Sequence, residues 1–437
     1  MPKFEYNFVK LIPEYLKIQI PQNWTTEFLE NMLTQSISYG ILLHDDNPDG
    51  IPIVTSAALE KSDGIKKNLI YVSKEIEEKF KRTRLNGGEI LISLVGYTGN
   101  IAVAPIWCKG FNVTRHVGVI RLKNEYFTNY FAYLLQSRPY QRKISAMTIG
   151  SAQPVINLRD LSKFIMIIPS INEQQKIASI LSNVDDLISS YDSIIETTKK
   201  LKIGLMQTLL TKGIGHKKFK KVKWLFGKEI EIPEIWTIEK ITNVGDEFGD
   251  SPFGSLLKSD DYTEHGVPVL QGRNIKNNRF IWEQKTFVSE EKFLSLKRNH
   301  CNVGDLVFQK IGTVGAVAII PKLDDHDTYV LSTNMMKMSV NKTIADVNFL
   351  YYLFVSNEMQ KVIQSIVRGN VQSIFNFTSL KKLKVLNPPL NEQQKIVDVL
   401  SNIDSKLNEI KSKKSNLETI KKGLMQKLLT GQIRVKV

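Results

Sequence analysis

Two segments of the chain share a framework but differ in the polar side chains that follow it. Residues 50–56 (Gly-Ile-Pro-Ile-Val-Thr-Ser) align with residues 266–274 (Gly-Val-Pro-Val-Leu-Gln-Gly-Arg-Asn). After the same proline, the first segment offers two hydroxyls, whereas the second offers a glutamine, an arginine and an asparagine. Arginine matches O6 and N7 of guanine in the major groove, and glutamine or asparagine matches N6 and N7 of adenine. These residue types predict two loops that contact DNA bases with different preferences.

Further candidates for DNA contacts are polar or aromatic residues at positions where the two similar parts of the chain differ. The full candidate set is Tyr39, Thr55, Ser56, Ser93, Tyr97, Arg115, His116, Ser151 and Gln153 in the first part, and Gln271, Arg273, Asn274, Gln309, Lys310, Thr313, Asn334, Asn370 and Gln372 in the second. Basic residues are expected to hold phosphates, which positions a protein on DNA without specifying sequence; these are Lys61, Arg82, Arg84, Lys276 and Arg298. The alternative for each candidate is an ordinary polar surface residue.

No residues with catalytic side chains gather into a recognisable active site. The six histidines and the scattered carboxylates show no spacing typical of metal ligands, and residues 44–46 (His-Asp-Asp) are interpreted as a solvated loop. Asp305 with Gln309 and Lys310 lacks the spacing of a nuclease site. We therefore expect a chain that is non-catalytic by itself and holds no metal and no cofactor.

One short motif has to be weighed against this expectation. Residues 387–390 (Asn-Pro-Pro-Leu) resemble the Asn-Pro-Pro-aromatic motif of amino-methyltransferases, but the aromatic residue is missing and no glycine-rich methyl-donor loop follows a strand. The corresponding residues 168–171 read Ile-Pro-Ser-Ile, which favours a strand-to-helix connector. The Gly-x-x-Gly sequences at residues 96–99 and 312–315 are likewise predicted to be tight hairpin turns, with a phosphate cradle as the alternative.

The composition favours a polyanionic partner. The 437 residues carry a formal net charge of +15, although a lysine-rich solubility surface would give the same balance. No apolar run reaches the ~18–20 residues that span a bilayer, and the first twenty residues lack the apolar core of a signal peptide. Cys108 and Cys301 are the only cysteines, which excludes a disulfide framework and fits a reducing cytoplasm.

Short motifs recur at a nearly constant distance. Residues 172–176 (Asn-Glu-Gln-Gln-Lys) recur at 391–395, a shift of 219 (391 − 172), and residues 204–207 (Gly-Leu-Met-Gln) recur at the same shift. An Ile-Pro-x-x-Trp sequence opens each part, at residues 20–24 and 232–236, with a smaller shift that indicates loop insertions or deletions. The chain is therefore interpreted as a tandem duplication.

A long amphipathic helix is predicted in each copy, after residues 172 and 391. Apolar residues alternate in steps of three and four, which is typical of a coiled-coil seam; they are Ile177, Leu181, Val184, Ile188, Tyr191, Ile195, Leu201 and Leu205, and then Ile396, Leu400, Ile403, Leu407, Ile410, Leu417, Ile420 and Leu424, with a flaw at Lys414. Each helix is expected to pair with the other. Antiparallel pairing is favoured because the short basic link at residues 216–224 then connects adjacent ends.

The two remaining parts are predicted to be mixed α/β domains. Strand–turn–strand signals at residues 89–104 and 305–320 precede helical stretches at residues 126–144 and 349–366. The predicted fold is thus α+β, with two mixed domains at residues 17–170 and 214–390 separated by helices at 171–213 and 391–437, after an N-terminal segment at 1–16, in a pseudo-twofold arrangement.

This doubled set of motifs resembles the specificity subunits of type I restriction-modification systems over nearly the whole chain. The resemblance implies two target-recognition domains, each for one half of a split, asymmetric site on double-stranded DNA. It also implies two methyltransferase (modification) subunits docked on the helices, restriction (helicase-nuclease) subunits recruited through them, and no membrane. The competing hypothesis is a non-catalytic coiled-coil scaffold that binds nucleic acid without sequence preference.

Overall fold

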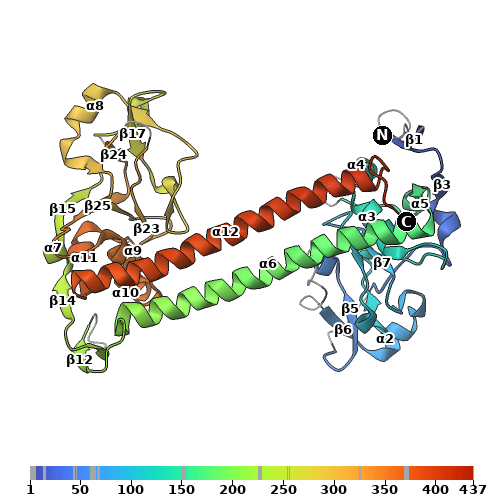
Figure 1. The fold of residues 1–437 in the computed structure, drawn as a ribbon, viewed down its shortest axis with the longest axis horizontal. Coiled ribbons are helices and arrows are strands. Elements are labelled where there is room, and N and C mark those ends of the chain that lie inside the picture. Colours follow the sequence, from blue (N-terminus) through green and yellow to red (C-terminus); the bar gives the residue numbers. More distant parts are fainter. Residues whose placement is uncertain are drawn as a thin grey trace. The chain divides into compact units, whose positions relative to one another are not determined.

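The computed structural model describes residues 6–12, 16–42, 45, 47–59, 65, 69–148, 154–224, 229–252, 254, 256–323, 326–368 and 374–436. It divides into two compact units. Unit 1 comprises residues 1–194 and 410–437, and unit 2 comprises residues 195–409. Each unit therefore contains one mixed domain and a part of each of two long helices, α6 (Ile171–Lys212) and α12 (Leu390–Leu428) (Figure 1).

Unit 1 is built on a four-stranded antiparallel sheet in the order β4-β10-β7-β8, beside a three-stranded sheet in the order β6-β5-β9. Strand β7 lies between β10 and β8, and it is buried along its length because Ile90 and Ile92 pack into one apolar cluster and Leu91 packs into another. Its described elements before α6 are β1 Tyr6–Ile12, β2 Leu16–Pro21, β3 Thr25–Phe28, η1 Leu29–Met32, β4 Ser38–Tyr39, β5 Ile51–Val54, η2 Ser56–Leu59, β6 Leu69–Val72, α2 Lys74–Glu78, η3 Lys81–Thr83, β7 Ile90–Ser93, β8 Ile101–Val103, η4 Ile106–Cys108, β9 Asn112–Val113, β10 Val117–Ile120, α3 Thr128–Gln136, α4 Arg138–Met147, α5 Leu158–Ser162 and β11 Ile165–Ile168.

Unit 2 repeats the four-stranded sheet in the order β15-β25-β22-β23, and helix α9 packs on β23 as α3 packs on β8 in unit 1. Its described elements between α6 and α12 are β12 Phe219–Lys223, β13 Glu229–Pro233, β14 Thr237–Lys240, α7 Ile241–Val244, β15 Gly245–Asp250, η6 Ser259–Asp261, β16 Tyr262–Thr263, β17 Val267–Leu270, η7 Gly272–Asn274, β18 Ile275–Lys276, β19 Arg279–Phe280, β20 Phe287–Val288, α8 Glu290–Ser295, η8 Lys297–Asn299, β21 His300–Asn302, β22 Leu306–Gln309, β23 Val317–Ile319, β24 Thr328–Leu331, β25 Met335–Val340, α9 Val347–Val355, α10 Asn357–Arg368, α11 Phe377–Lys381 and β26 Lys384–Asn387.

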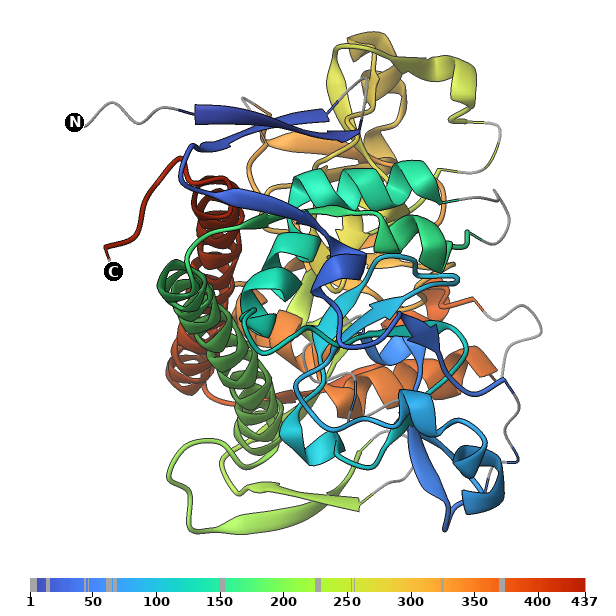
Figure 2. The ribbon, with the colours of Figure 1, turned by 90° about the vertical axis from the view of Figure 1, so that its right-hand side faces the viewer.

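Within each unit α6 and α12 lie side by side and run antiparallel (Figures 1 and 2). In unit 1 Asp185 pairs with Lys421 and Asp192 with Lys414, so numbers rise along one helix as they fall along the other. The predicted fold class, two mixed domains with long helices in an antiparallel coiled coil, is confirmed. The connectors are confirmed as well, since only two residues lie between β11 and α6 and between β26 and α12.

The predicted seam is right except at two equivalent positions. Leu201 and Ile420 are 54% and 52% exposed, and the adjacent lysines face the partner helix instead. Lys202 binds Asp404 at 2.6 Å in unit 2, and Lys421 binds Asp185 at 2.5 Å in unit 1. Each aspartate also accepts a hydrogen bond from a tyrosine of the adjoining domain, Tyr352 or Tyr133.

The flaw that the sequence shows at Lys414 is explained by an ion pair. Its Nζ lies 2.6 Å from the Asp192 carboxylate of α6, and this hydrogen bond raises the pKa of Lys414. The lysine thus stays charged in the seam and continues the alternation of three and four residues.

The Glu of each Asn-Glu-Gln-Gln-Lys motif holds the segment that leaves the other long helix. In unit 2 the buried Glu392 accepts hydrogen bonds from Nε1 of Trp236 (2.9 Å), Nε2 of His216 (2.7 Å) and the backbone of Ile214 (3.0 Å). In unit 1 the buried Glu173 binds Arg434 at 2.9 Å. In unit 2 the tryptophan of Ile-Pro-x-x-Trp is therefore part of a clasp between the start of α12 and the end of α6, whereas in unit 1 Arg434 lies over the ring of Trp24.

The clasp also explains why a glycine follows each helix. Gly213 and Gly431 adopt left-handed φ values of 66° and 70°. A Cβ at Gly213 would lie 2.3 Å from the Glu392 carboxylate, and one at Gly431 would lie 2.4 Å from the Pro21 ring. Both the backbone conformation and the available space therefore require glycine.

We expect Glu392→Ala to destabilise unit 2 by about 2–4 kcal/mol, because it leaves the buried indole donor of Trp236 and the backbone donor of Ile214 without their acceptor. Hydrogen exchange of the amides of α9 and β25, followed by mass spectrometry, measures the change within unit 2. Lys395→Ala, an exposed change three residues further along α12, is the matched control. Equal exchange in the two variants would show that the clasp contributes nothing to stability.

Candidate nucleic-acid interface

In unit 1 the ends of four strands bring the predicted residues to one edge of the domain. Strand pairing sets Ser93 opposite Val117, at the start of β10, and the backbone of Arg115 donates to Ile41 just after β4 (2.8 Å). The backbone of Thr114 donates to Val54 at the end of β5 (3.0 Å). We call edge 1 the set of described candidates gathered in this way: Tyr39, Thr55, Ser56, Ser93, Tyr97, Arg115 and His116.

The side chains of edge 1 differ in what they can contact. Tyr39, Tyr97 and Arg115 are exposed. Nε of Arg115 donates to Nε2 of His116 at 3.1 Å, which leaves the imidazole proton on Nδ1. Burial, followed by the charge of Arg115, lowers the pKa of His116, so the ring is neutral at pH 7 and offers a directed donor rather than a charge.

Ser93, by contrast, is a structural residue of the hairpin. It is fully buried, and its hydroxyl donates to the carbonyl of Tyr97 and accepts from the backbone of Asn100 at 2.8 Å. The glycines of Gly-x-x-Gly have positive φ values (78° and 85° at Gly96 and Gly99), as the predicted tight turn requires. A direct contact between Ser93 and DNA therefore does not fit its position.

Unit 2 forms the equivalent edge. The backbone of Ser332 donates to Leu270 at the end of β17 (2.9 Å), and the backbone of Lys310 donates to Asn334 (2.9 Å), where a left-handed φ of 68° suits asparagine. We call edge 2 the described candidates gathered there: Gln271, Arg273, Asn274, Gln309, Lys310, Thr313 and Asn334.

Two residues of edge 2 support the loops instead of facing solvent. Asn274 is buried, accepts from the backbone of Gln271 at 2.8 Å and donates to the carbonyl of Ile281 at 3.0 Å. Gln309 lies beneath two loops, and a Cβ at Gly272 would meet its side-chain nitrogen at 2.7 Å. The exposed Arg273 is held by a 2.6 Å hydrogen bond to Thr286.

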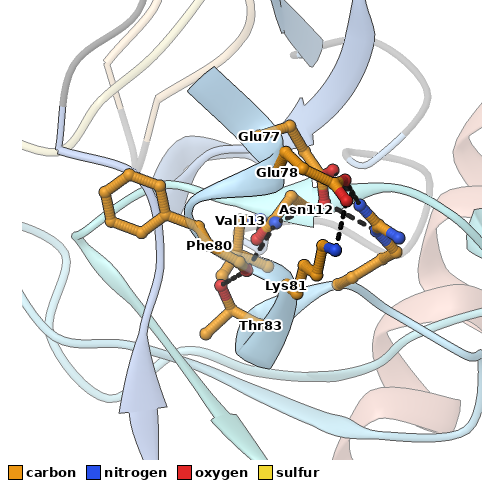
Figure 3. A network of polar contacts seen from close by, with 8 residues as sticks. Glu77, Glu78, Phe80, Lys81, Thr83, Asn112 and Val113 are labelled. Carbon is orange, nitrogen blue, oxygen red and sulfur yellow. Dashed lines mark hydrogen bonds and ion pairs between the residues drawn. The ribbon is translucent and has the colours of Figure 1, made fainter. Parts of the chain in front are cut away.

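Of the basic residues predicted to hold phosphates, Arg82, Arg84 and Lys276 have partners within the chain, whereas Arg298 is exposed. Figure 3 shows the carboxylates of Glu77 and Glu78 with Asn112, and Arg84 binds both glutamates, with 2.8 Å from its Nε to Glu77. The hydrogen bond from Arg84 is the main cause that lowers the pKa of Glu77. Arg84 thus holds the two glutamates of α2, one of which also binds Asn112 of β9, and a phosphate role does not fit it.

Arg82 and Lys276 of this group also bind other residues of the chain, whereas Lys61 cannot be placed. Arg82 binds Ser36, and Lys276 lies 3.2 Å from Glu283 at the surface. Lys61 lies outside the described residues, as do the base-contact candidates Ser151, Gln153, Asn370 and Gln372. The residues that follow these candidates lie at the edges: the backbone carbonyl of Pro154 accepts a hydrogen bond from Gly96, and the backbone N–H of Phe375 donates one to Lys310.

Asp250, which is not among the residues predicted from the sequence, also lies at edge 2, and we add it to that set. It ends β15, pairs with Met336 of β25 and binds Lys310 at 2.8 Å. An aspartate is an unexpected neighbour for a polyanion, and no motif marks it. Only the duplicated sheet order, which sets β15 beside β25 as β4 lies beside β10, could have located it.

Within the residues that the structure describes, no group of three or more His, Cys, Asp or Glu side chains is placed to hold a metal ion. No described helix is long and apolar enough to cross a membrane.

Comparison with known proteins gives consistent matches. The family model for the type I restriction modification DNA specificity domain matches residues 21–200 and again residues 236–419. The putative type I restriction enzyme MjaX specificity subunit of Methanocaldococcus jannaschii is 30% identical over 437 residues, covering 96% of this chain and 95% of that protein. The MjaVIII specificity subunit of the same organism is 30% identical over 299 residues, covering 67% and 68%.

Solved structures show the same fold at low sequence identity. The S subunit of a type I restriction-modification system from M. genitalium aligns with a TM-score of 0.55 at 17% identity, covering 96% of this chain and 98% of that one. A chain from a study of complex assembly and conformational transition of the type I R-M system aligns with a TM-score of 0.59 at 15% identity, covering 95% and 99%.

We predict that Ser93→Ala lowers the free energy of unfolding of unit 1 by about 1–2 kcal/mol, because two hydrogen bonds of the hairpin are lost. DNA sequence preference should stay unchanged. Ser56→Ala, at a half-buried position of the same edge, is the control and should change stability by less than about 0.5 kcal/mol. Denaturant unfolding and DNA-binding assays measure both effects. An altered preference at unchanged stability would make Ser93 a contact residue after all.

Proposed function

The chain belongs to the type I restriction modification DNA specificity family: it is a specificity subunit with two recognition domains and is not an enzyme by itself. From this premise we propose how the chain works. Edge 1 and edge 2 each read one half of a bipartite, asymmetric DNA target. The methyltransferase subunits dock on the long helices, and the restriction subunits join through them. A chromosomal DNA partner and two buried free thiols support the cytoplasm as the place of action.

One observation carries the two-reader proposal. The same strand order and the same backbone hydrogen bonds present different side chains at the two edges. Edge 1 offers hydroxyls, tyrosines and an arginine–histidine pair, whereas edge 2 offers Gln271, Arg273 and an aspartate–lysine pair. Since base edges are discriminated by donor and acceptor patterns, a shared frame with different side chains supports two different half-sites. A non-specific scaffold would gain nothing from this difference.

The exposed apolar residues of the long helices support docking of two like partners. Leu201 of unit 2 and Ile420 of unit 1 are equivalent in the repeat and about equally exposed. Further exposed apolar side chains of the two helices are Ile203 and Val399 in unit 2, and Leu187 and Ile194 in unit 1, and exposed apolar surface marks a protein contact. The duplication thus offers one exposed apolar residue at the same helix position in each unit, which supports two modification subunits for each specificity subunit.

Replacing residues 17–170 by the corresponding domain of another specificity subunit should change one half of the methylated motif and leave the other half intact. The reason is that edge 1 is assembled from strands of that domain alone. Methylome sequencing of a host that carries the hybrid with its modification subunit gives the motif directly. A change in both halves would contradict the two-reader proposal.

Inserting four residues at equivalent places in α6 and α12 should lengthen the spacer of the motif by about two base pairs. Four residues add about 6 Å and slightly more than one helical turn, so the seam nearly keeps its register. Two inserted residues rotate the seam by about 200° and should abolish assembly with the modification subunit instead. Methylome sequencing and size-exclusion chromatography measure these outcomes. An unchanged spacer in a well-assembled four-residue variant would mean that the helices do not set the distance.

A further inference from the structure

We propose that Asp250 and Lys310 together read one G·C base pair of the half-site that unit 2 recognises. The proposal rests on the function proposed above and names a recognition element within it. The two side chains come from different strands, β15 and the end of β22, and meet at edge 2. Their side chains are 40% and 16% exposed, so both are partly shielded but reachable from solvent.

The hydrogen bonds of the pair leave one donor and one acceptor available. Nζ of Lys310 donates to Oδ1 of Asp250 at 2.8 Å and lies 3.3 Å from the hydroxyl of Ser251. Oδ1 of Asp250 also accepts from the backbone of Ser251 at 2.8 Å. An ammonium has three hydrogens and a carboxylate two oxygens. One hydrogen of Lys310 and Oδ2 of Asp250 therefore keep no partner among the described residues.

This donor and acceptor match a G·C pair in the major groove. Guanine presents its O6 and N7 acceptors beside the N4 amino donor of cytosine. Lysine donates to the guanine acceptors, and aspartate accepts from cytosine N4. The aspartate also neutralises the lysine, which weakens its attraction for any phosphate and directs the ammonium to a base.

The equivalent position of unit 1 shows that the fold does not need a lysine here. Leu94 is buried there, and its backbone makes the same two contacts as that of Lys310: the amide donates across to the turn before β10, and the carbonyl accepts from the re-entering chain. The acceptor residues are His116 for Leu94 and Asn334 for Lys310. Removing a charge pair from water costs free energy that a leucine avoids. Because the same backbone frame accommodates a leucine in unit 1, folding does not require the charged pair in unit 2, and recognition explains its presence.

The same comparison supplies the test variant. Lys310→Leu places the residue of unit 1 on the same backbone frame, so it should fold. Asp250→Asn keeps the shape and removes the charge, and it tests the pair without any change in volume. Lys361→Leu removes one positive charge from a 73% exposed lysine of unit 2 and serves as the matched control.

The experiment uses each variant assembled with its modification subunits. Methylation rates are measured on duplexes in which each base pair of the unit 2 half-site is replaced in turn. For the unchanged chain, replacing one G·C pair should lower the rate about tenfold to a hundredfold. Lys310→Leu should reduce that ratio to within about twofold at this position alone. Asp250→Asn should admit A·T there, because an amide matches adenine. Lys361→Leu should change nothing.

Each other outcome overturns a distinct claim. If Lys310→Leu and Asp250→Asn both keep the discrimination of the unchanged chain at every position, or if the relaxed position is an A·T pair, the Asp250–Lys310 proposal is wrong while the two-reader function stands. If Lys310→Leu fails to assemble, Asp250→Asn decides by the same criterion. If the unchanged chain directs methylation to no bipartite motif, the proposed function itself is wrong.

Discussion

Each long helix starts with a buried glutamate that binds the chain leaving the other long helix, and the rest of each unit depends on this clasp. Glu392 satisfies the indole of Trp236 and the backbone after α6, while Glu173 binds Arg434 after α12. Because a buried carboxylate is stable only with such partners, each helix start depends on the chain that follows the other long helix. The clasp therefore ties two segments more than 150 residues apart in sequence into one unit and fixes the helix pair against the domain.

The seam between the helices also fixes the register of the two helices against each other. Lys202 with Asp404 and Tyr352 in unit 2 repeats Lys421 with Asp185 and Tyr133 in unit 1. An apolar seam alone would permit slippage by a turn, whereas a partly buried ion pair that also binds a tyrosine of the adjoining domain has one register. The charged positions of the seam thus align each domain with the helix pair as well as one helix with the other.

The sequence predicts the duplication, the helices and the hairpins well because each leaves a periodic or repeated pattern. Spacing and hydrophobicity disagree at Leu201 and Ile420. Seven residues after Ile195 the seam position is Lys202, and seven residues after Lys414 it is Lys421; spacing is the better guide because each lysine has an ion-pair partner. The site is less predictable. Ser93, Asn274 and Arg84 have side chains suited to DNA, but burial and internal hydrogen bonds, which no residue type reveals, make them structural. Asp250 is missed for the opposite reason: the aspartate alone gives no sign of DNA recognition, and its ion-pair partner Lys310 lies 60 residues away in the sequence.

The contrast between Leu94 and Lys310 shows how one frame can support different DNA preferences. At both positions the backbone amide and carbonyl are fully used by neighbouring loops, so the main chain is fixed whatever the side chain is. The side chain is then free to change from an apolar residue to one half of an ion pair, provided that a neighbouring strand supplies the counter-charge, as β15 does with Asp250. Recognition changes in this fold therefore require coordinated substitutions on adjacent strands, because a lone buried lysine would be costly and a lone aspartate would repel the phosphates. A duplicated frame of this kind lets one half-site change without disturbing the clasp or the seam, since neither shares a residue with the edges.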